Sequence, residues 1–401
     1  MYSPLLGEFP TLPELPAPCW DYVLNAATHP LSYTLCCSNR ACGILHLNTE
    51  EILSLSELDT LAEGHMSAIA RAYVSGGAAD ELTLRANCED WQRIRLMPRV
   101  LVDVSRLDLA TKVIDQQFPL PILLAPAAFH RLCHPEAEIA TVEGANRAGA
   151  GIVLSSLSTV SVEDVTRAAK HPVWFQLYTQ IDRGLTQQMV QRAEAAGCKA
   201  ICVTVDTPVL GARHREARSH FTLPADFKLP NLNLGATSHR PIRGAIYSEL
   251  LNPTLTWNDI EWLRSIAHVP VLLKGVLNPE DAVRAIDSCV AAVIVSNHGA
   301  RNLDTLPSTA QVLPRIAEKV QGRLPLLVDG GIRRGTDVLK ALALGAQAVL
   351  IGRPYLYGLA VGGAEGVARV INILRNELMM AMALTGRTAI GQIDRSVLWP
   401  E

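Results

Sequence analysis

The segment SNHGAR, residues 296–301, places a histidine and an arginine three residues apart at the end of an apolar run. The pKa of an ordinary histidine is about 6.5, so its side chain can accept a proton near neutral pH. The guanidinium of arginine is a permanent cation whose planar donors fit a carboxylate. His298 and Arg301 therefore predict a base beside an anion-binding group.

Similar polar residues follow other apolar runs of the chain at the same relative place. These are Ser155 and Ser156, Gln176 and Tyr178, Thr204 and Asp206, Lys274, Asp329, and Arg353. The carboxyl ends of the strands of a barrel meet at one mouth, where barrel enzymes build their active sites. Stability alone gives no reason for this placement, so the pattern predicts a site for chemistry.

The elements that must position these residues are short apolar runs that alternate with helix-like segments. The apolar runs are 121–128, 151–156, 173–178, 200–206, 269–275, 291–297, 325–331 and 348–354. Their nearly continuous hydrophobicity is typical of buried parallel strands. The clearest helix-like segments are 135–149, 161–170, 182–197, 257–267, 279–288 and 334–346. Eight such units predict an α/β fold, a (β/α)₈ TIM barrel, with a doubly wound open sheet as the alternative.

Two parts of the chain stand apart from this alternation. Residues 1–50 are rich in proline, contain four of the nine cysteines, and predict an irregular N-terminal extension before a barrel domain at 51–401. His29 and His46 lie near those cysteines, but the spacings match no usual zinc pattern. About 50 residues follow the fourth strand before the next helix, which predicts a long loop over the substrate site.

Composition narrows the class of protein. The 401 residues have a net charge of −3, which gives no reason to expect nucleic acid as a partner. Nine scattered cysteines fit a reducing compartment, and no apolar run is long enough for a membrane span. No signal-peptide pattern is present, and the final LWPE is not a peroxisomal address, so we expect a cytoplasmic protein.

Two glycine- and arginine-containing segments predict a phosphate site. VDGGIRRG at 328–335 and IGRP at 351–354 follow the seventh and eighth predicted strands. Barrels commonly bind phosphate in the loops after these two strands, with backbone amides, a helix N-terminus and cations as ligands. The phosphate would belong to the substrate or to a cofactor such as flavin mononucleotide (FMN).

From about residue 52 to residue 401 the chain resembles the FMN-dependent α-hydroxy-acid oxidases and dehydrogenases. The motifs that carry the resemblance occur in family order, and the most specific are SNHGAR followed by DGGIRRG, with AYVSGGAADELTLRAN, WFQLY, TVDTPVLGAR, LLKGV and IGRP. The resemblance implies oxidation of a small L-2-hydroxy acid to the 2-keto acid. Oxygen, with hydrogen peroxide as product, or another acceptor would reoxidise the flavin, and a homotetramer is expected.

The resemblance also implies roles for individual residues. His298 would be the base and Asp206 would stabilise its imidazolium, while Lys274 would lie by the flavin's pyrimidine edge. The residues implied to bind substrate are Tyr73, Tyr178, Arg213, His298 and Arg301. Those implied to bind the cofactor are Ala125, Ala127, Ser155, Gln176, Thr204, Lys274 and Ser296 at the ring, Asp329 at the ribityl chain, and Gly331, Arg333, Gly352 and Arg353 at the phosphate.

Two positions depart from the family pattern, and three other functions compete with it. Asn302 replaces a common glutamine, and Leu157 stands where glycolate oxidase-like members have tryptophan, which predicts a larger substrate than glycolate. The alternatives are an FMN-binding barrel for a different substrate, a catalytically idle relative that acts as a binding protein, and a metal-dependent barrel enzyme. The combination of His298, Asp206, Arg213 and Arg301 argues against the first two. A mouth with one histidine and few carboxylates, instead of a cluster of ligands, argues against the third.

Overall fold

The computed structural model describes residues 49–232, 246–247 and 251–400, all within one compact unit. The extension predicted for residues 1–50 lies outside these ranges except for its last two residues, as do its four cysteines and two histidines. That prediction therefore stays open. Residues 233–245 and 248–250 of the long loop after the fourth strand also lie outside the described ranges.

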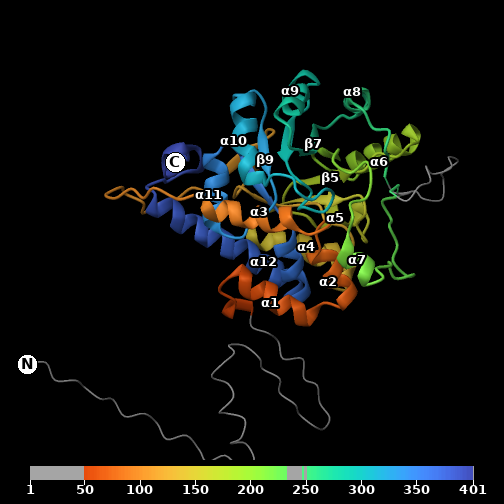
Figure 1. Ribbon diagram of the computed structural model, residues 1–401, viewed down its shortest axis with the longest axis horizontal. Coiled ribbons are helices and arrows are strands. Elements are labelled where there is room, and N and C mark those ends of the chain that lie inside the picture. The colour runs from red at the N-terminus through yellow and green to blue at the C-terminus, as the bar shows by residue number, and fades with distance from the viewer. Residues whose placement is uncertain (1–48, 233–245, 248–250, 401) are drawn as a thin grey trace, which may run out of the picture. The chain divides into compact units, whose positions relative to one another are not determined.

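A closed barrel of eight parallel strands forms the centre of the structure (Figure 1). The barrel closes because β10 pairs with β3, with Val349 opposite Ile122. This closure confirms the predicted (β/α)₈ barrel and excludes the open sheet. Each predicted strand overlaps an observed one: β3 Ile122–Leu124, β4 Gly151–Ser155, β5 Val173–Leu177, β6 Ile201–Thr204, β7 Val271–Val276, β8 Ala292–Val295, β9 Leu326–Val328 and β10 Ala348–Ile351.

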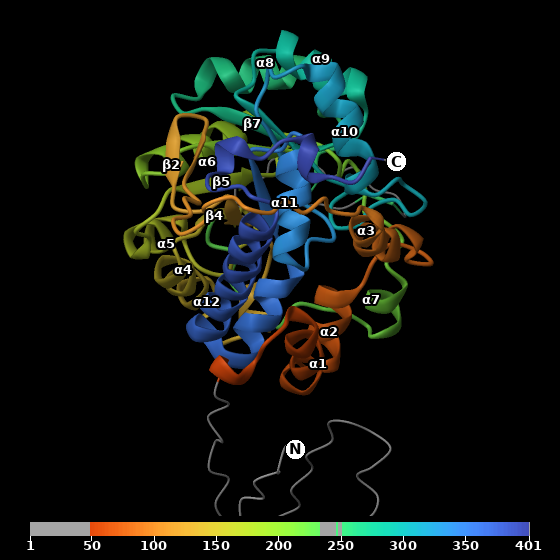
Figure 2. The same cartoon turned by 90° about the vertical axis from the view of Figure 1, so that its left-hand side faces the viewer.

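Helices between the strands surround the barrel (Figures 1 and 2). They are α4 Ala137–Ala148, α5 Val162–Ala168, α6 Arg183–Ala195, α8 Trp257–Ile266, α9 Pro279–Asp287, α10 Thr309–Val320, α11 Gly335–Ala343 and α12 Arg353–Leu384. Side-chain caps define several starts: Ser161 Oγ accepts from an amide of α5, and Asn278 caps α9 with Pro279 in its first turn. None of the helices described is long and apolar enough to cross a membrane.

Alternating side chains divide the apolar core into two layers. In β4, Ile152 and Leu154 pack against the surrounding helices, whereas Val153 belongs to the inner cluster of the barrel. The inner cluster also contains Trp174 and Phe118, whose rings meet edge to face at 5.9 Å. Phe118 belongs to an antiparallel hairpin, β1 Thr111–Val113 and β2 Gln116–Phe118, which packs on the amino ends of β4 and β5. The sequence did not predict this hairpin.

Helices before the barrel reach its opposite, carboxyl end. They are α1 Leu55–His65, α2 Ala68–Ser75 and α3 Leu82–Arg93, and α2 contacts α7 His214–Arg218 of the long loop after β6. Figure 2 shows α2 and α7 side by side although about 140 residues of chain separate these two helices. Asp304 fixes the start of α3 by accepting hydrogen bonds from backbone amides that include Leu82 and Thr83.

Candidate active site

A cavity of about 350 Å³ lies at the carboxyl ends of the barrel strands. All but two of the predicted site residues line it: Tyr73, Ala125, Ala127, Ser155, Gln176, Tyr178, Thr204, Arg213, Lys274, His298, Arg301, Asp329, Gly331, Arg333, Gly352 and Arg353. The two exceptions, Asp206 and Ser296, lie directly behind the lining and contact residues that form it. The cavity therefore unites residues spread over 281 positions, from Tyr73 to Arg353.

His298 and Asp206 form a hydrogen-bonded pair at the cavity wall. His298 Nδ1 lies 2.8 Å from Asp206 Oδ1, and the hydroxyl of Thr207 donates to the same oxygen at 3.0 Å. Burial has the largest effect on the pKa of His298 and lowers it below 6.5, although Asp206 opposes that shift. Neutral His298 therefore donates from Nδ1 to the carboxylate, which leaves Nε2 as the lone-pair nitrogen, 3.4 Å from the Tyr178 hydroxyl.

The carboxylate of Asp206 is buried yet stays ionised. Burial by itself raises the pKa of Asp206, but the adjacent His298 and Lys274 and the Thr207 hydrogen bond outweigh it, and the pKa is lowered. Oδ2 of Asp206 is buried, has no hydrogen-bond partner among the described residues, and lies against Gly275. A Cβ at Gly275, where φ is +106°, would lie 2.3 Å from Asp206 Cγ. Glycine at 275 is therefore required for the position of the carboxylate.

The backbone of the SNHGAR segment is held in an uncommon conformation. His298, Gly299 and Ala300 have φ of +57°, +60° and +60°, in the left-handed region. Non-glycine residues adopt this region rarely and at a free-energy cost, and such positions concentrate at functional sites. Asn297 Oδ1 stabilises the turn by accepting from the amide of Ala300. The turn brings the imidazole and the guanidinium of Arg301 to the same cavity.

Lys274 supplies a buried positive charge next to this pair. Its Nζ lies 3.1 Å from Asp329 Oδ2 and donates to Ser296 Oγ at 3.0 Å. Burial lowers the pKa of Lys274, but Asp329 and Asp206 together outweigh it, so the pKa is raised and the lysine stays charged. Ser296 Oγ also accepts from the amide of His298. Ser296 therefore positions Lys274 and His298, and its predicted contact with the cofactor stays a prediction.

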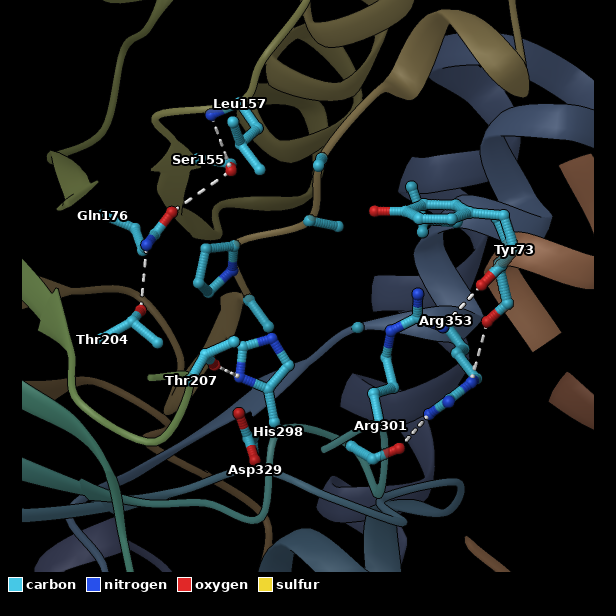
Figure 3. A pocket seen from close by; sticks show the side chains of 18 of the residues that line it. Tyr73, Ser155, Leu157, Gln176, Thr204, Thr207, His298, Arg301, Asp329 and Arg353 are labelled. Carbon is cyan, nitrogen blue, oxygen red and sulfur yellow. Dashed lines mark hydrogen bonds between the residues drawn. The ribbon is translucent and has the colours of Figure 1, made fainter. Parts of the chain in front are cut away.

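Arg213 and Arg301 face each other across a carboxylate that the sequence did not predict as part of the site. Arg301 donates to Glu216 Oε1 at 2.8 Å, and Arg213 lies 3.6 Å from Glu216 Oε2. The guanidinium of Arg301 also covers the ring of Tyr73, 4.7 Å from its centroid, and donates to backbone carbonyls of residues 73 and 76. Figure 3 shows the Tyr73 phenol pointing into the cavity beside Arg301 and Arg353.

The residues predicted for phosphate binding form a cationic end of the cavity. Arg353 is partly buried, and within the described residues it donates only to backbone carbonyls, those of Val74, Gly76 and Gly299. Burial, together with the nearby Arg301, lowers the pKa of Arg353 to about 10. A partly buried cation with no carboxylate partner among the described residues favours an anionic ligand, because the ligand would restore the charge balance. This end of the cavity fits a phosphate.

The rest of the lining fits a polar aromatic ring and a hydroxylated chain. Gln176 links Ser155 and Thr204 by hydrogen bonds of 3.2 and 2.9 Å, which fixes its amide at the cavity wall (Figure 3). Within the part of the chain that the structure describes, the buried Asp329 Oδ1 has no hydrogen-bond partner, so at the cavity wall it can accept from a ligand hydroxyl. Gly331 has φ of +82°, and a Cβ there would lie 1.9 Å from the Asn87 carbonyl oxygen. The donor set therefore matches FMN.

Sequence reasoning missed the residues that cover the cavity from the long loop after β6. Glu216 belongs to α7, and Phe221 and Leu223 follow it; all three line the cavity. Phe221 stacks on Tyr73 with 4.8 Å between the ring centroids. Arg213 is the N-cap of α7 and stands three residues before Glu216, a spacing that is consistent with an ion pair but does not by itself place Glu216 in the site. The described part of the loop supports the expectation that this segment covers the site.

The chain belongs to the family of FMN-dependent dehydrogenases, whose sequence pattern matches residues 62–400. This membership confirms FMN as the cofactor. Among curated proteins, the chain is 49% identical to an L-lactate oxidase of Nostoc sp., over 86% of this chain and 98% of the relative. It is 45% identical to glycolate oxidase 3 of Oryza sativa subsp. indica, over 86% and 96%.

A solved structure of mandelate oxidase with (S)-2-phenylpropionate superposes with a TM-score of 0.80. Its sequence is 36% identical, and the match covers 87% of this chain and 98% of that protein. The relatives and this structure agree with the fold and the cofactor derived above. Among the residues described, no group of three or more histidine, cysteine or acidic side chains has a geometry for holding a metal ion.

Proposed function

We propose that the protein oxidises an L-2-hydroxy acid to the corresponding 2-keto acid with FMN as the oxidant. The observation that carries the proposal is that His298, which is hydrogen-bonded to Asp206, lines one cavity with Arg213, Arg301 and the FMN-binding residues. A base, a carboxylate anchor and a flavin are the three components that this oxidation requires. The names of the L-lactate oxidase and glycolate oxidase relatives support the same substrate class.

Different residues of the chain have different roles in this reaction. Arg301 and Arg213 bind the substrate carboxylate, because guanidinium groups pair with carboxylates through parallel hydrogen bonds. The neutral Nε2 of His298 accepts the proton that the substrate loses, and Asp206 stabilises the imidazolium formed at that step. Tyr178, whose hydroxyl lies 3.4 Å from Nε2, orients the substrate hydroxyl. Bound FMN would supply the acceptor for the two electrons and for the second proton, so that both hydrogens lost by the alcohol are accounted for.

The electrostatics of the site suit this division. The pKa of Tyr178 is raised, mainly by burial and then by Asp206, so the phenol keeps its proton and can donate a hydrogen bond. Lys274 remains charged beside Asp329 at the cavity wall. A fixed buried cation stabilises negative charge that develops on a bound ring. These groups hold one protonation state across neutral pH, which leaves His298 as the group that changes.

Substrate size follows from Leu157. This side chain lines the cavity, and its amide is hydrogen-bonded to Ser155 Oγ at 3.1 Å, so the backbone fixes its direction (Figure 3). Leucine in place of a larger tryptophan leaves room for a substrate longer than glycolate. We expect Leu157→Trp to lower kcat/KM for 2-hydroxyoctanoate and mandelate far more than for glycolate. An equal loss for all three acids would contradict this assignment.

The experiment that tests the function is anaerobic mixing of the yellow holoprotein with glycolate, lactate, 2-hydroxyoctanoate and mandelate. At least one of them is expected to bleach the flavin and yield its 2-keto acid in equal amount, with glycolate not the best. No bleaching by any 2-hydroxy acid would overturn the proposal. Admitting oxygen then tests the proposed acceptor, because recovery of the yellow colour with one hydrogen peroxide per cycle identifies an oxidase. Light scattering tests the expected homotetramer.

A further inference from the structure

Glu216 occupies a position that the proposed reaction does not use. Its side chain is only 14% exposed, lines the cavity, and lies between the two arginines that the proposal assigns to the substrate carboxylate. One carboxylate oxygen accepts from Arg301, and the other faces Arg213. A carboxylate of the chain thus binds the same pair of cations as the carboxylate of the substrate.

The two arginine side chains repel each other, and their partial burial strengthens this repulsion. Burial lowers the pKa of Arg213 first, and the nearby charge of Arg301 lowers it further, whereas Glu216 raises it. Arg301 is anchored on the other side by backbone carbonyls of residues 73 and 76 and by the ring of Tyr73. Arg213 in turn donates to the backbone carbonyl of Arg301. Glu216 therefore offsets one of two partly buried positive charges that these contacts hold close together.

The charges at this site indicate how many negative charges the ligand carries. Two guanidinium groups and one internal carboxylate leave a net charge of +1, which one ligand carboxylate balances. We expect a ligand with two carboxylates to bring its second negative charge close to Glu216, because its first would bind the two arginines that Glu216 itself contacts. Like charges brought together in a partly buried site weaken binding and serve as a basis for specificity.

We propose that Glu216 is a specificity-determining residue that restricts the substrate to 2-hydroxy acids with a single carboxylate. The inference rests on the proposed function, since it assigns Arg213 and Arg301 to the substrate carboxylate. Glu216 is a positioning residue for the two arginines and takes no part in the transfer of protons or electrons. Its ionised carboxylate, rather than its shape, determines the selection.

The test measures binding of two anions that the enzyme cannot oxidise, propionate and malonate. They share a three-carbon frame and differ in charge, and neither has a hydroxyl group. Calorimetric titration of the FMN-loaded protein at fixed ionic strength yields both dissociation constants without any turnover. A failure of the charge proposal is therefore separable from a failure of the proposed oxidation, which the bleaching experiment detects.

The unchanged protein is expected to bind propionate more tightly than malonate. Glu216→Gln keeps the size and one hydrogen-bond acceptor but removes the charge. This variant should lower the dissociation constant of propionate by about threefold and that of malonate by about tenfold, because the Coulomb energy grows with the ligand charge. Glu216→Asp retains the charge and should retain the preference for propionate.

A surface variant controls for the loss of one negative charge. Glu365 forms an exposed ion pair with Arg147, with 70% of its side chain accessible, and Glu365→Gln should leave both dissociation constants unchanged. Tighter binding of malonate than of propionate by the unchanged protein would overturn the proposal without any variant. The proposal would also be overturned if Glu216→Gln increased the affinity for malonate by no more than the affinity for propionate. A lower affinity of this variant for both anions would overturn it as well.

Discussion

The site combines two regions of different construction. His298, Asp206 and Lys274 stand at the ends of barrel strands, where buried ladders and a closed hydrogen-bond network fix them. Tyr73 and Glu216 come instead from α2 and α7, short helices far apart in sequence that meet over the mouth. The first region holds the groups that exchange protons and stabilise charge, and the second covers and selects the ligand. The chemical step therefore depends on the barrel, and binding depends on the covering helices.

The largest expected effect is at the strand ends. His298→Gln removes the base and keeps the size, so the rate constant for flavin reduction should fall by about 10²–10⁴-fold. FMN content and the affinity for propionate should change little, because neither depends on the imidazole. Stopped-flow absorbance under anaerobic conditions measures the rate. Full-speed reduction in this variant would remove His298 from the mechanism.

Arg301 connects the two regions, because it follows β8 yet contacts Tyr73 and Glu216. Arg301→Lys loses the paired donors of the guanidinium, and kcat/KM should fall by about 100-fold. Arg147→Lys, in an exposed ion pair with Glu365, is the matched control and should be neutral. Steady-state kinetics measures both. A loss of less than about threefold in Arg301→Lys would exclude it as the carboxylate anchor.

The rigidity of the strand-end region is tested at Gly275. Gly275→Ala adds a Cβ that collides with Asp206 and forces alanine to φ of +106°, so unfolding free energy should fall by about 2–4 kcal/mol. Gly197 has φ of +96° and nothing within 4 Å of an added Cβ. Gly197→Ala should therefore lose only about 1 kcal/mol. Denaturant unfolding measures both; equal losses would show that the contact with Asp206 is unimportant.

The dependence on pH reports the strand-end region alone. The pKa of His298 lies below 6.5, so kcat/KM should rise about tenfold per pH unit below that pKa and level off above it. Lys274 and Tyr178 have raised pKa values, so the plateau should continue through pH 9. A pH profile of kcat/KM checks this. An acid limb centred well above pH 6.5 would contradict a base shielded by burial.

The smallest effect is expected in the covering region. Phe221→Ala removes the ring that stacks on Tyr73 at 4.8 Å, and an aromatic pair of this kind contributes about 1 kcal/mol. KM should rise by about fivefold with little change in the rate of flavin reduction. Leu384→Ala, at a side chain that is 70% exposed, is the control. A slower chemical step with unchanged KM would contradict the division between the two regions.

The same division explains how far the sequence was informative. Strand hydrophobicity and the polar residues at strand ends follow from local patterns, so the barrel, a phosphate site and the positions of His298 and Lys274 could be predicted. FMN as the ligand followed from the resemblance of the sequence motifs to a known family. The hairpin that contains Phe118 and the role of Glu216 depend on packing between segments distant in sequence. Local periodicity carries no such information, and α7, with only five residues, shows no recognisable pattern. The domain boundary near residue 50 stays a prediction.

The most direct test of the account is anaerobic single turnover of the holoprotein with the two enantiomers of lactate. The account predicts that the L enantiomer bleaches the flavin and yields one pyruvate per FMN, whereas the D enantiomer and propionate leave it yellow. Because propionate has the carboxylate and lacks the hydroxyl, it separates binding from oxidation. The central claim is that this cavity oxidises L-2-hydroxy acids. It would be contradicted if L-lactate and every other L-2-hydroxy acid left the flavin oxidised.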